Sequence, residues 1–129
     1  MAQLAENDVE LLRRPNLAIV ATIGPDGTPQ LTPTWVDTDG EHVLVNTAEG
    51  RAKPRNLRRD PRVGVCVVDH EDGYWWVALT GTAELTHEGA EEHIHKLSHK
   101  YRGRDYDKPK DPQRILVTIT PERISRYGD

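Results

Sequence analysis

The sequence has no phenylalanine and a single cysteine, and none of its apolar runs is long enough to cross a bilayer. One cysteine excludes a disulfide framework within the chain. Because Cys66 stands in the apolar run Val63–Val68, we expect it to be a core residue in a reducing compartment. No signal-peptide pattern precedes the first expected helix. Together these absences predict a cytoplasmic protein that does not associate with membranes.

Size and charge narrow the class of protein further. A chain of 129 residues is long enough for one buried core, so we expect a single domain over residues 1–129. The formal net charge is -4, the isoelectric point is about 5.8 and the mean hydropathy is -0.70. An acidic chain without a second basic face is a poor candidate for nucleic-acid binding.

Basic residues are nevertheless concentrated in one segment, residues 47–62. Its six cations are Arg51, Lys53, Arg55, Arg58, Arg59 and Arg62. Gly50 allows a turn, and we expect a helix to begin near Ala52–Pro54, because proline is tolerated in a first helical turn. Free N–H groups and basic side chains at a helix start suit a phosphate. The alternative is a solvated basic helix.

Elsewhere the pattern is one of short strands joined by turns. Residues 24–27, Gly-Pro-Asp-Gly, predict a tight turn, and Pro33 predicts an edge strand or a bulge. The expected strands are Leu17–Ile23, Thr28–Val36, His42–Asn46, Val63–Val68, Tyr74–Thr86 with an interruption at Gly81, and Arg114–Ser125. Besides the basic helix, the expected helices are Ala5–Arg13 and Glu88–Tyr101, and residues 102–112 are an expected loop. Six strands in this arrangement predict a small antiparallel barrel.

Aromatic residues could wall a pocket for a ring-shaped cofactor. Trp35, Tyr74, Trp75 and Trp76 are available, and on a strand Trp75 faces away from Tyr74 and Trp76. One set can therefore face a site while the other faces the core or a partner chain. We expect at least two of the four to be core or dimer contacts.

Other groupings of reactive residues are weak. His95 and His99 have a helical spacing that can bind zinc, but they do not form a His-Glu-x-x-His motif, so we expect no metal. The serines lack convincing histidine and acid partners, and no glycine-rich dinucleotide loop occurs.

Several segments together carry a resemblance. They are residues 17–22 (Leu-Ala-Ile-Val-Ala-Thr), 24–30 (Gly-Pro-Asp-Gly-Thr-Pro-Gln), 31–36 (Leu-Thr-Pro-Thr-Trp-Val), the basic run 51–63 and 81–85 (Gly-Thr-Ala-Glu-Leu). Over roughly residues 10–127 the chain resembles the split-barrel flavin/deazaflavin oxidoreductases, the superfamily of pyridoxamine 5'-phosphate oxidase. It is most similar to the actinobacterial branch that uses the deazaflavin coenzyme F420. Residues 53–62 are the most specific part of the match.

The resemblance implies a mainly β fold with α, a six-stranded antiparallel split barrel with short helices. It also implies a homodimer with two cofactor sites at the interface. In those sites Arg51, Lys53 and Arg55 would face the cofactor phosphate, with Asn56 nearby. The strand that contains Thr32, Pro33 and Thr34 would lie beside the ring system, and Tyr74 would lie near the deazaflavin.

The function implied is hydride transfer between coenzyme F420 and a small organic substrate such as an enone or a quinone. The lack of an acid–base set agrees with this function, because the cofactor carries the reactive hydride. A proton could come from solvent, Tyr74 or Tyr101. Arg58, Arg59 and Arg62 could hold the poly-glutamate tail of F420 or form a solvated face. The alternatives are an FMN-dependent oxidase or reductase of the same fold and a non-catalytic F420 carrier.

Overall fold

The computed structural model describes residues 2–107 and 112–128, so the expected loop 102–112 lies partly outside the described residues. Three helices and seven strands are present. In chain order they are α1 (Glu6–Arg13), β1 (Ala18–Ile23), β2 (Pro29–Thr34), β3 (Asp37–Thr38), β4 (Val43–Ala48), α2 (Ala52–Arg59), β5 (Arg62–Val68), β6 (Trp76–Thr86), α3 (Ala90–Arg102) and β7 (Arg114–Tyr127). The expected helices and strands are all confirmed, with ends that differ by a few residues.

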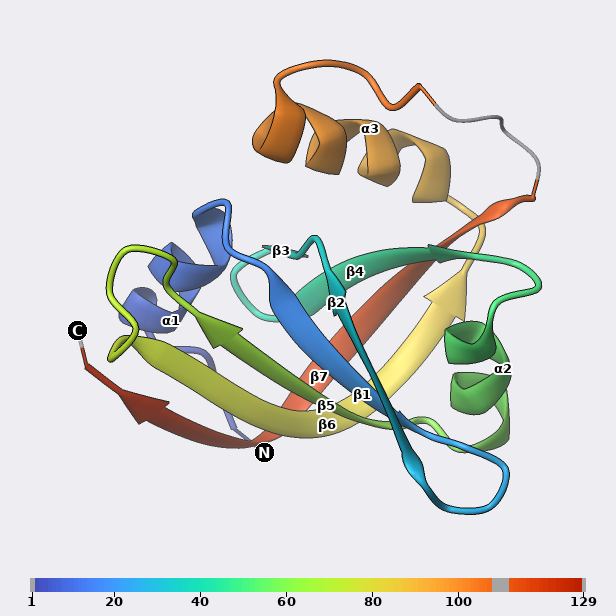
Figure 1. Ribbon diagram of the computed structural model, residues 1–129, viewed down its shortest axis with the longest axis horizontal. Coiled ribbons are helices and arrows are strands. Elements are labelled where there is room, and N and C mark those ends of the chain that lie inside the picture. The colour runs from blue at the N-terminus through green and yellow to red at the C-terminus, as the bar shows by residue number, and fades with distance from the viewer. Residues whose placement is uncertain (1, 108–111, 129) are drawn as a thin grey trace.

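All seven strands belong to one antiparallel sheet with the order β2-β1-β5-β6-β7-β4-β3 (Figure 1). β2 and β3 occupy opposite edges of this order, although β3 begins only a few residues after β2 ends. The sheet must therefore curl until its two edges approach each other. The predicted strand number of six was wrong, because Asp37–Thr38, which lies outside all six expected strands, pairs with Val43 and Leu44 of β4.

The core fills the inner side of the curled sheet. On β5 the side chains alternate, so that Val63, Val65 and Val67 are buried while Cys66 is only partly buried on the outer side. The prediction that Cys66 is a core residue was therefore wrong. The apolar run did not show which of its residues face away from the core, because valine and cysteine are found on either side of a strand.

Two predicted irregularities of the sheet are confirmed. Between Thr80 and Gly81 the register of β6 and β7 shifts, and a Cβ on Gly81 would lie 2.1 Å from the carbonyl oxygen of Thr120. Only glycine permits this close approach. Pro33 lies on β2, the edge strand, where a missing N–H leaves no ladder bond unmade.

Side chains of α3 attach this helix to the sheet and to α1. The Nζ of Lys100 donates to the carbonyl oxygens of Leu12 at 2.5 Å and Val36 at 2.6 Å. The hydroxyl of Tyr101 donates to the carbonyl of Asn16 and accepts from the N–H of Val36. These bonds hold α3 over one end of the sheet, beside Trp35. Among the described residues, no helix is both long and apolar enough to span a membrane.

Candidate functional site

The basic helix α2 begins where β4 ends. Gly50 has a φ of 87°, which reverses the chain, and Arg51 caps the helix with extended backbone. Pro54 is the third helical residue, so its missing N–H removes no helical bond. The N–H groups of Ala52 and Lys53 lack partners within the helix and point outward from its start. The sequence prediction of a helix start at this place is confirmed.

A hollow of about 260 Å³ lies at this helix start, and we call it the α2 hollow. It is lined by Gln30, Thr32, Pro33, Thr34, Asn46, Thr47, Arg51, Ala52 and Lys53. The Oγ1 of Thr32 is buried there without a hydrogen-bond partner in the described residues. Burial is the main cause that lowers the pKa of Lys53, and the charge of Arg51 lowers it further. Lys53 has no ion pair among residues 2–107 and 112–128. An ammonium without a counterion, in the same hollow as an unpaired hydroxyl, favours binding of an anion.

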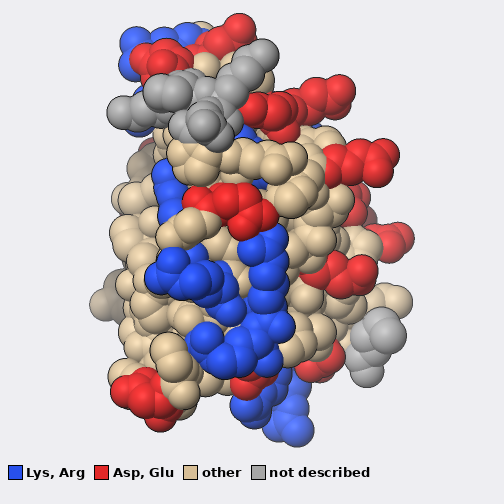
Figure 2. Space-filling view, turned by 90° about the vertical axis from the view of Figure 1, so that its right-hand side faces the viewer, with Lys and Arg blue, Asp and Glu red and all other residues tan. Residues whose placement is uncertain are grey.

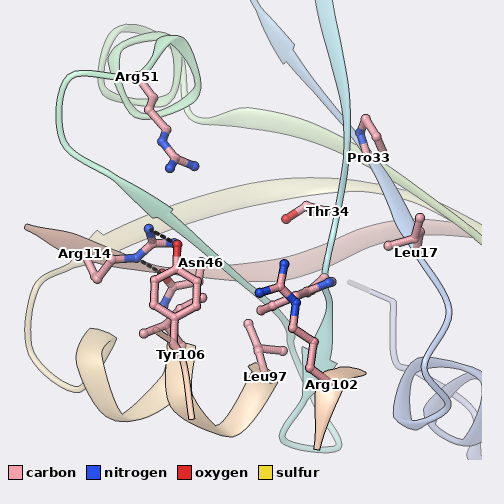
Figure 3. Close-up of a pocket in the computed structure, with 11 residues that line it drawn as sticks. Leu17, Pro33, Thr34, Asn46, Arg51, Leu97, Arg102, Tyr106 and Arg114 are labelled. Carbon is pink, nitrogen blue, oxygen red and sulfur yellow. Dashed lines mark hydrogen bonds between the residues drawn. The ribbon is translucent and has the colours of Figure 1, made fainter. Parts of the chain in front are cut away.

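A second hollow of about 310 Å³ lies between α3 and the sheet, and we call it the α3 hollow (Figure 3). Its lining consists of Leu17, Pro33, Thr34, Trp35, Asn46, Arg51, Ile94, Leu97, Arg102, Tyr106 and Arg114. Four of these residues also line the α2 hollow, so the two hollows form one continuous cleft. The ring of Trp35 stacks on Tyr101 with centroids 5.3 Å apart, and the guanidinium of Arg102 lies 5.0 Å from the Trp35 centroid.

Five of the eight predicted cofactor residues line the α2 hollow together. They are Thr32, Pro33, Thr34, Arg51 and Lys53. The strand β2 supplies the first three, and the start of α2 supplies the other two. Segments about 20 residues apart in sequence thus meet at one anion-binding surface. Their contact with a cofactor stays a prediction.

Arg55 and Asn56 brace this site and do not line it. The Nη1 of Arg55 donates to the carbonyl of Gly50 at 2.7 Å, which closes the turn before the helix. Asn56 is buried, and its Nδ2 donates to the Oγ1 of Thr22 at 3.0 Å. Within this chain, Arg55 fixes the turn that precedes α2, and Asn56 holds α2 against β1. Their predicted contact with a phosphate stays untested.

Tyr74 lies far from the cleft within one chain. It precedes β6 and follows the end of β5, whereas α2 precedes the start of β5, so the length of the sheet separates them (Figure 1). Its side chain is 77% exposed. A role for Tyr74 near a ring therefore requires a second chain. Trp75 is buried in the core, which makes it one of the expected core or dimer contacts among the four aromatic residues.

The three arginines considered for a poly-glutamate tail already have partners within the chain. Arg58 donates to both carboxylate oxygens of Glu49 at 2.7 Å, and Arg62 pairs with Asp60 at 2.8 Å. Arg59 donates to the carbonyl of Ile23 and to the Oδ1 of Asn56. Figure 2 shows basic side chains gathered on this face, with acidic groups among them. These pairs favour the alternative that the three arginines form a solvated face.

Some lining residues were missed by sequence reasoning. Asn46 carried a weak signal, as a buried polar residue inside the apolar strand β4. Arg114 begins β7 and is 6% exposed, which a sequence cannot distinguish from an ordinary solvated arginine. Tyr106 lies in a loop after α3, where no periodicity marks it. Their convergence depends on the curl of the sheet.

The two histidines considered for zinc have other contacts. The Nδ1 of His95 accepts from the backbone N–H of Tyr106 at 3.0 Å, and the Nε2 of His99 lies 2.5 Å from Asp105. Over residues 2–107 and 112–128, no cluster of three or more histidine, cysteine or acidic side chains could hold a metal ion.

A curled antiparallel sheet with a cationic cleft at one helix start defines the split-barrel class of cofactor-binding domains. Residues 4–127 match the model of the family described as pyridoxamine 5'-phosphate oxidase, so the chain belongs to this family.

Comparison with solved structures agrees with this family assignment. A structure named F420 reductase is 30% identical, with a TM-score of 0.84 over 95% of this chain and 98% of that chain. A conserved hypothetical protein of Mycobacterium tuberculosis is 29% identical, with a TM-score of 0.76 over 96% of this chain and 84% of that chain. HupZ of Group A Streptococcus is 25% identical, with a TM-score of 0.73 over 95% and 93%.

Proposed function

We propose that this protein is an F420-dependent oxidoreductase that transfers a hydride between the deazaflavin and a small organic substrate such as an enone or a quinone. The observation that carries the proposal is the unmatched Lys53 beside Thr32 and the free N–H groups of α2. This set of donors fits the phosphate of a flavin-type cofactor. The likeness to the structure named F420 reductase supports F420 over FMN.

When bound, F420 would supply the hydride chemistry, and the residues of this chain would supply binding and orientation. Lys53, Arg51 and the N–H groups at the start of α2 would hold the phosphate. The adjoining α3 hollow, with Trp35 as a wall, would take the flat part of the acceptor substrate and exclude water.

Tyr101 is a poor proton donor for this reaction. Burial is the main cause that raises its pKa, to about 12. Its hydroxyl is engaged with the backbone of Asn16 and Val36. Tyr106 lines the cleft directly, and its hydroxyl accepts from the Nη1 of Arg114 at 3.4 Å. A proton for the product would therefore come from solvent or from a residue at the cleft.

We further propose that two chains form a homodimer through the outer face of β2, β1 and β5. Leu31 is 62% exposed, Leu17 is 54% exposed and Ile19 is 40% exposed. Ile19 lies between Pro33 and Cys66 in the strand register, so these apolar groups are continuous. Leu17 and Pro33 also line the α3 hollow. A second copy seated on this face would close the cleft and complete two sites.

The dimer is tested by sedimentation of the wild type and of Leu31→Glu at micromolar concentration. We expect a dimer for the wild type and a monomer with weakened cofactor affinity for the variant, because a charge on an apolar interface is left without a partner. Thr28→Glu, at an exposed position ahead of the same strand, is the control. A monomeric wild type would contradict the interface.

The function itself is tested by titrating the purified protein with F420 and with FMN. The protein is then mixed with reduced F420 and a panel of enones and quinones. Binding of F420 followed by acceptor-dependent oxidation supports the proposal. Binding of F420 without turnover on any acceptor indicates a carrier, and tight binding of FMN alone indicates the flavin alternative.

A further inference from the structure

Arg114 is a buried cation without a carboxylate partner. It is 6% exposed, and no carboxylate of residues 2–107 and 112–128 lies within 4.0 Å of its guanidinium nitrogens. Burial is the main cause that lowers the pKa of Arg114, and the charge of Arg51 adds to it, whereas Tyr106 and the more distant Glu91 oppose the shift. A guanidinium loses favourable hydration when it is buried, and in proteins such a group normally has an anionic partner.

Hydrogen bonds through Asn46 fix the orientation of Arg114. Its Nε donates to the Oδ1 of Asn46 at 2.8 Å. The Nδ2 of Asn46 donates to the carbonyl of Ala90 at 2.9 Å and lies 3.1 Å from the Nδ1 of His93. The amide of Asn46 is therefore held with its oxygen toward Arg114. The guanidinium carbon also lies 5.2 Å from the ring centroid of Tyr106.

These contacts leave the terminal nitrogens of Arg114 as donors toward the α3 hollow. Its only other hydrogen bond among the described residues is a long one of 3.4 Å, from Nη1 to the hydroxyl of Tyr106. In Figure 3, Arg114 approaches the hollow from β7, Arg51 from α2 and Arg102 from the end of α3. Among the described residues that line the hollow, none is acidic.

The rest of the hollow suits a flat apolar body. Leu97 and Ile94 of α3 form an apolar floor, with Leu17 at the rim. Trp35 and Tyr106 supply aromatic surface, and their rings meet edge to face at 6.4 Å. The volume of about 310 Å³ is at the lower end of the usual size of small-molecule sites, which is about 300–1,000 Å³.

We propose that the α3 hollow binds a carboxylate on the acceptor substrate, with Arg114 as the buried anchor and Arg102, whose Nη1 lies 3.9 Å from the Oδ1 of Asp107, as a weaker second cation at the mouth. This inference rests on the proposed function and narrows it, because it names the substrate class as conjugated aromatic acids. The planar guanidinium edge matches a planar carboxylate. The phosphate of the cofactor is assigned to the neighbouring α2 hollow and does not compete for Arg114.

The first experiment measures binding alone, without hydride transfer. The probes are 4-[(E)-3-oxobut-1-enyl]benzoate and its methyl ester, which share the enone and the ring and differ in charge. Calorimetric titration of the purified protein should show the acid binding at least about tenfold more tightly than the ester, the scale of one charge-assisted hydrogen bond. This result does not depend on which cofactor the protein uses, so it can stand even if the proposed function fails.

Variants then identify the anchor. Arg114→Met should abolish the preference for the acid, Arg114→Lys should keep part of it, and Arg102→Gln should reduce it by a smaller factor. Arg104→Gln is the matched control, because Arg104 is exposed close to α3 and does not line the hollow. If Arg114→Met fails to fold, Arg102→Gln and Arg114→Lys still decide the question, since either must lower the preference.

Two results would overturn the inference. Equal affinity of the wild type for the acid and the ester would remove the carboxylate site. The second result concerns the poly-glutamate tail of F420, whose carboxylates could bind Arg114 in the same way as a substrate carboxylate. Suppose that Arg114→Met weakens binding of long-tailed F420 but not of F420 without glutamates, while the preference for the acid probe survives. Arg114 would then serve the cofactor tail and not the substrate.

Discussion

At the start of α2, Lys53 is half buried and has no counterion among the described residues, whereas near its end Arg58 holds both oxygens of Glu49 at 2.7 Å. The two side chains lie on the same short helix and carry the same charge. They differ in whether the chain supplies its own anion. A run of cations therefore does not define a binding site. The cations that we expect to bind an external anion are those that the fold leaves without an internal partner among the described residues.

The most direct test of this difference between Lys53 and Arg58 is to replace each of them separately. Lys53→Ala should weaken F420 affinity by about 1.5–3 kcal/mol, the range for a hydrogen bond to a charged group. Arg58→Ala should leave the affinity within about twofold, because its partner is an exposed carboxylate of the same chain. Fluorescence quenching of F420 measures both affinities.

The thermal stability of the Lys53 variant is the control for this experiment. Since Lys53 makes no ion pair within the described chain, its removal should not lower the thermal midpoint. Lys53→Arg should recover part of the affinity, because it restores the charge with a different geometry. Equal losses in Lys53→Ala and Arg58→Ala would show that the cofactor contacts the whole length of α2.

The difference between the two ends of α2 could not be read from the sequence. The residues of the basic run, the glycine before it and the proline in its first turn were enough to place the helix. Whether Arg58 faces Glu49 or a ligand depends on the turn from β4 into α2. The burial of Arg114 depends on the curl that brings the start of β7 beside β4 and the loop after α3. Local patterns predict elements, and only the closed sheet decides which charges meet.

Some aspects of the fold were more predictable than others. The apolar run of β5 and the glycine at 81 predicted a strand and a break, because both reflect local backbone and side-chain geometry. The outward placement of Cys66 was missed, because every residue of its run is small or apolar. The edge strand β3 was missed as well, since two residues between turns carry no period.

A buried histidine behind the cleft, His93, should make the stability of the protein depend on pH. His93 is 7% exposed, and burial is the main cause that lowers its pKa to about 4 from an ordinary 6.5. The charge of Asp37 opposes this shift, whereas the charges of Lys96, Arg114 and Lys100 add to it. A depressed folded-state pKa contributes stability that is complete above about 6.5 and is lost as the pH falls toward 4. Between pH 7 and pH 5, His93 should therefore remove about 2 kcal/mol of the free energy of unfolding.

His93→Gln isolates this contribution, because its side chain keeps a hydrogen-bonding group for Asn46 but does not titrate. Urea unfolding at the two pH values should show a smaller loss of stability in the variant than in the wild type. An unchanged pH dependence in His93→Gln would mean that the ring accepts a proton in the folded protein.

The smallest expected effect belongs to the paired end of α2. Hydrogen bonds from Arg58 and then from His87, 2.6 Å away, hold the pKa of Glu49 at about 2. Because the folded-state pKa is lowered from 4.5, the contribution to stability is present above that value and is lost as the pH falls toward 2.

The pair is exposed and screened by salt, so Glu49→Gln should change the thermal midpoint by at most about 2 °C at pH 5 and by less at pH 3. Calorimetry of the variant and the wild type at both pH values measures this difference. At pH 7 the same variant should bind F420 within about threefold of the wild type, because a neutral side chain at 49 frees Arg58 without touching the α2 hollow. A larger change in affinity, in either direction, would mean that Arg58 exchanges its ion pair with Glu49 for a contact with the bound cofactor. The two ends of the helix would then act as one site.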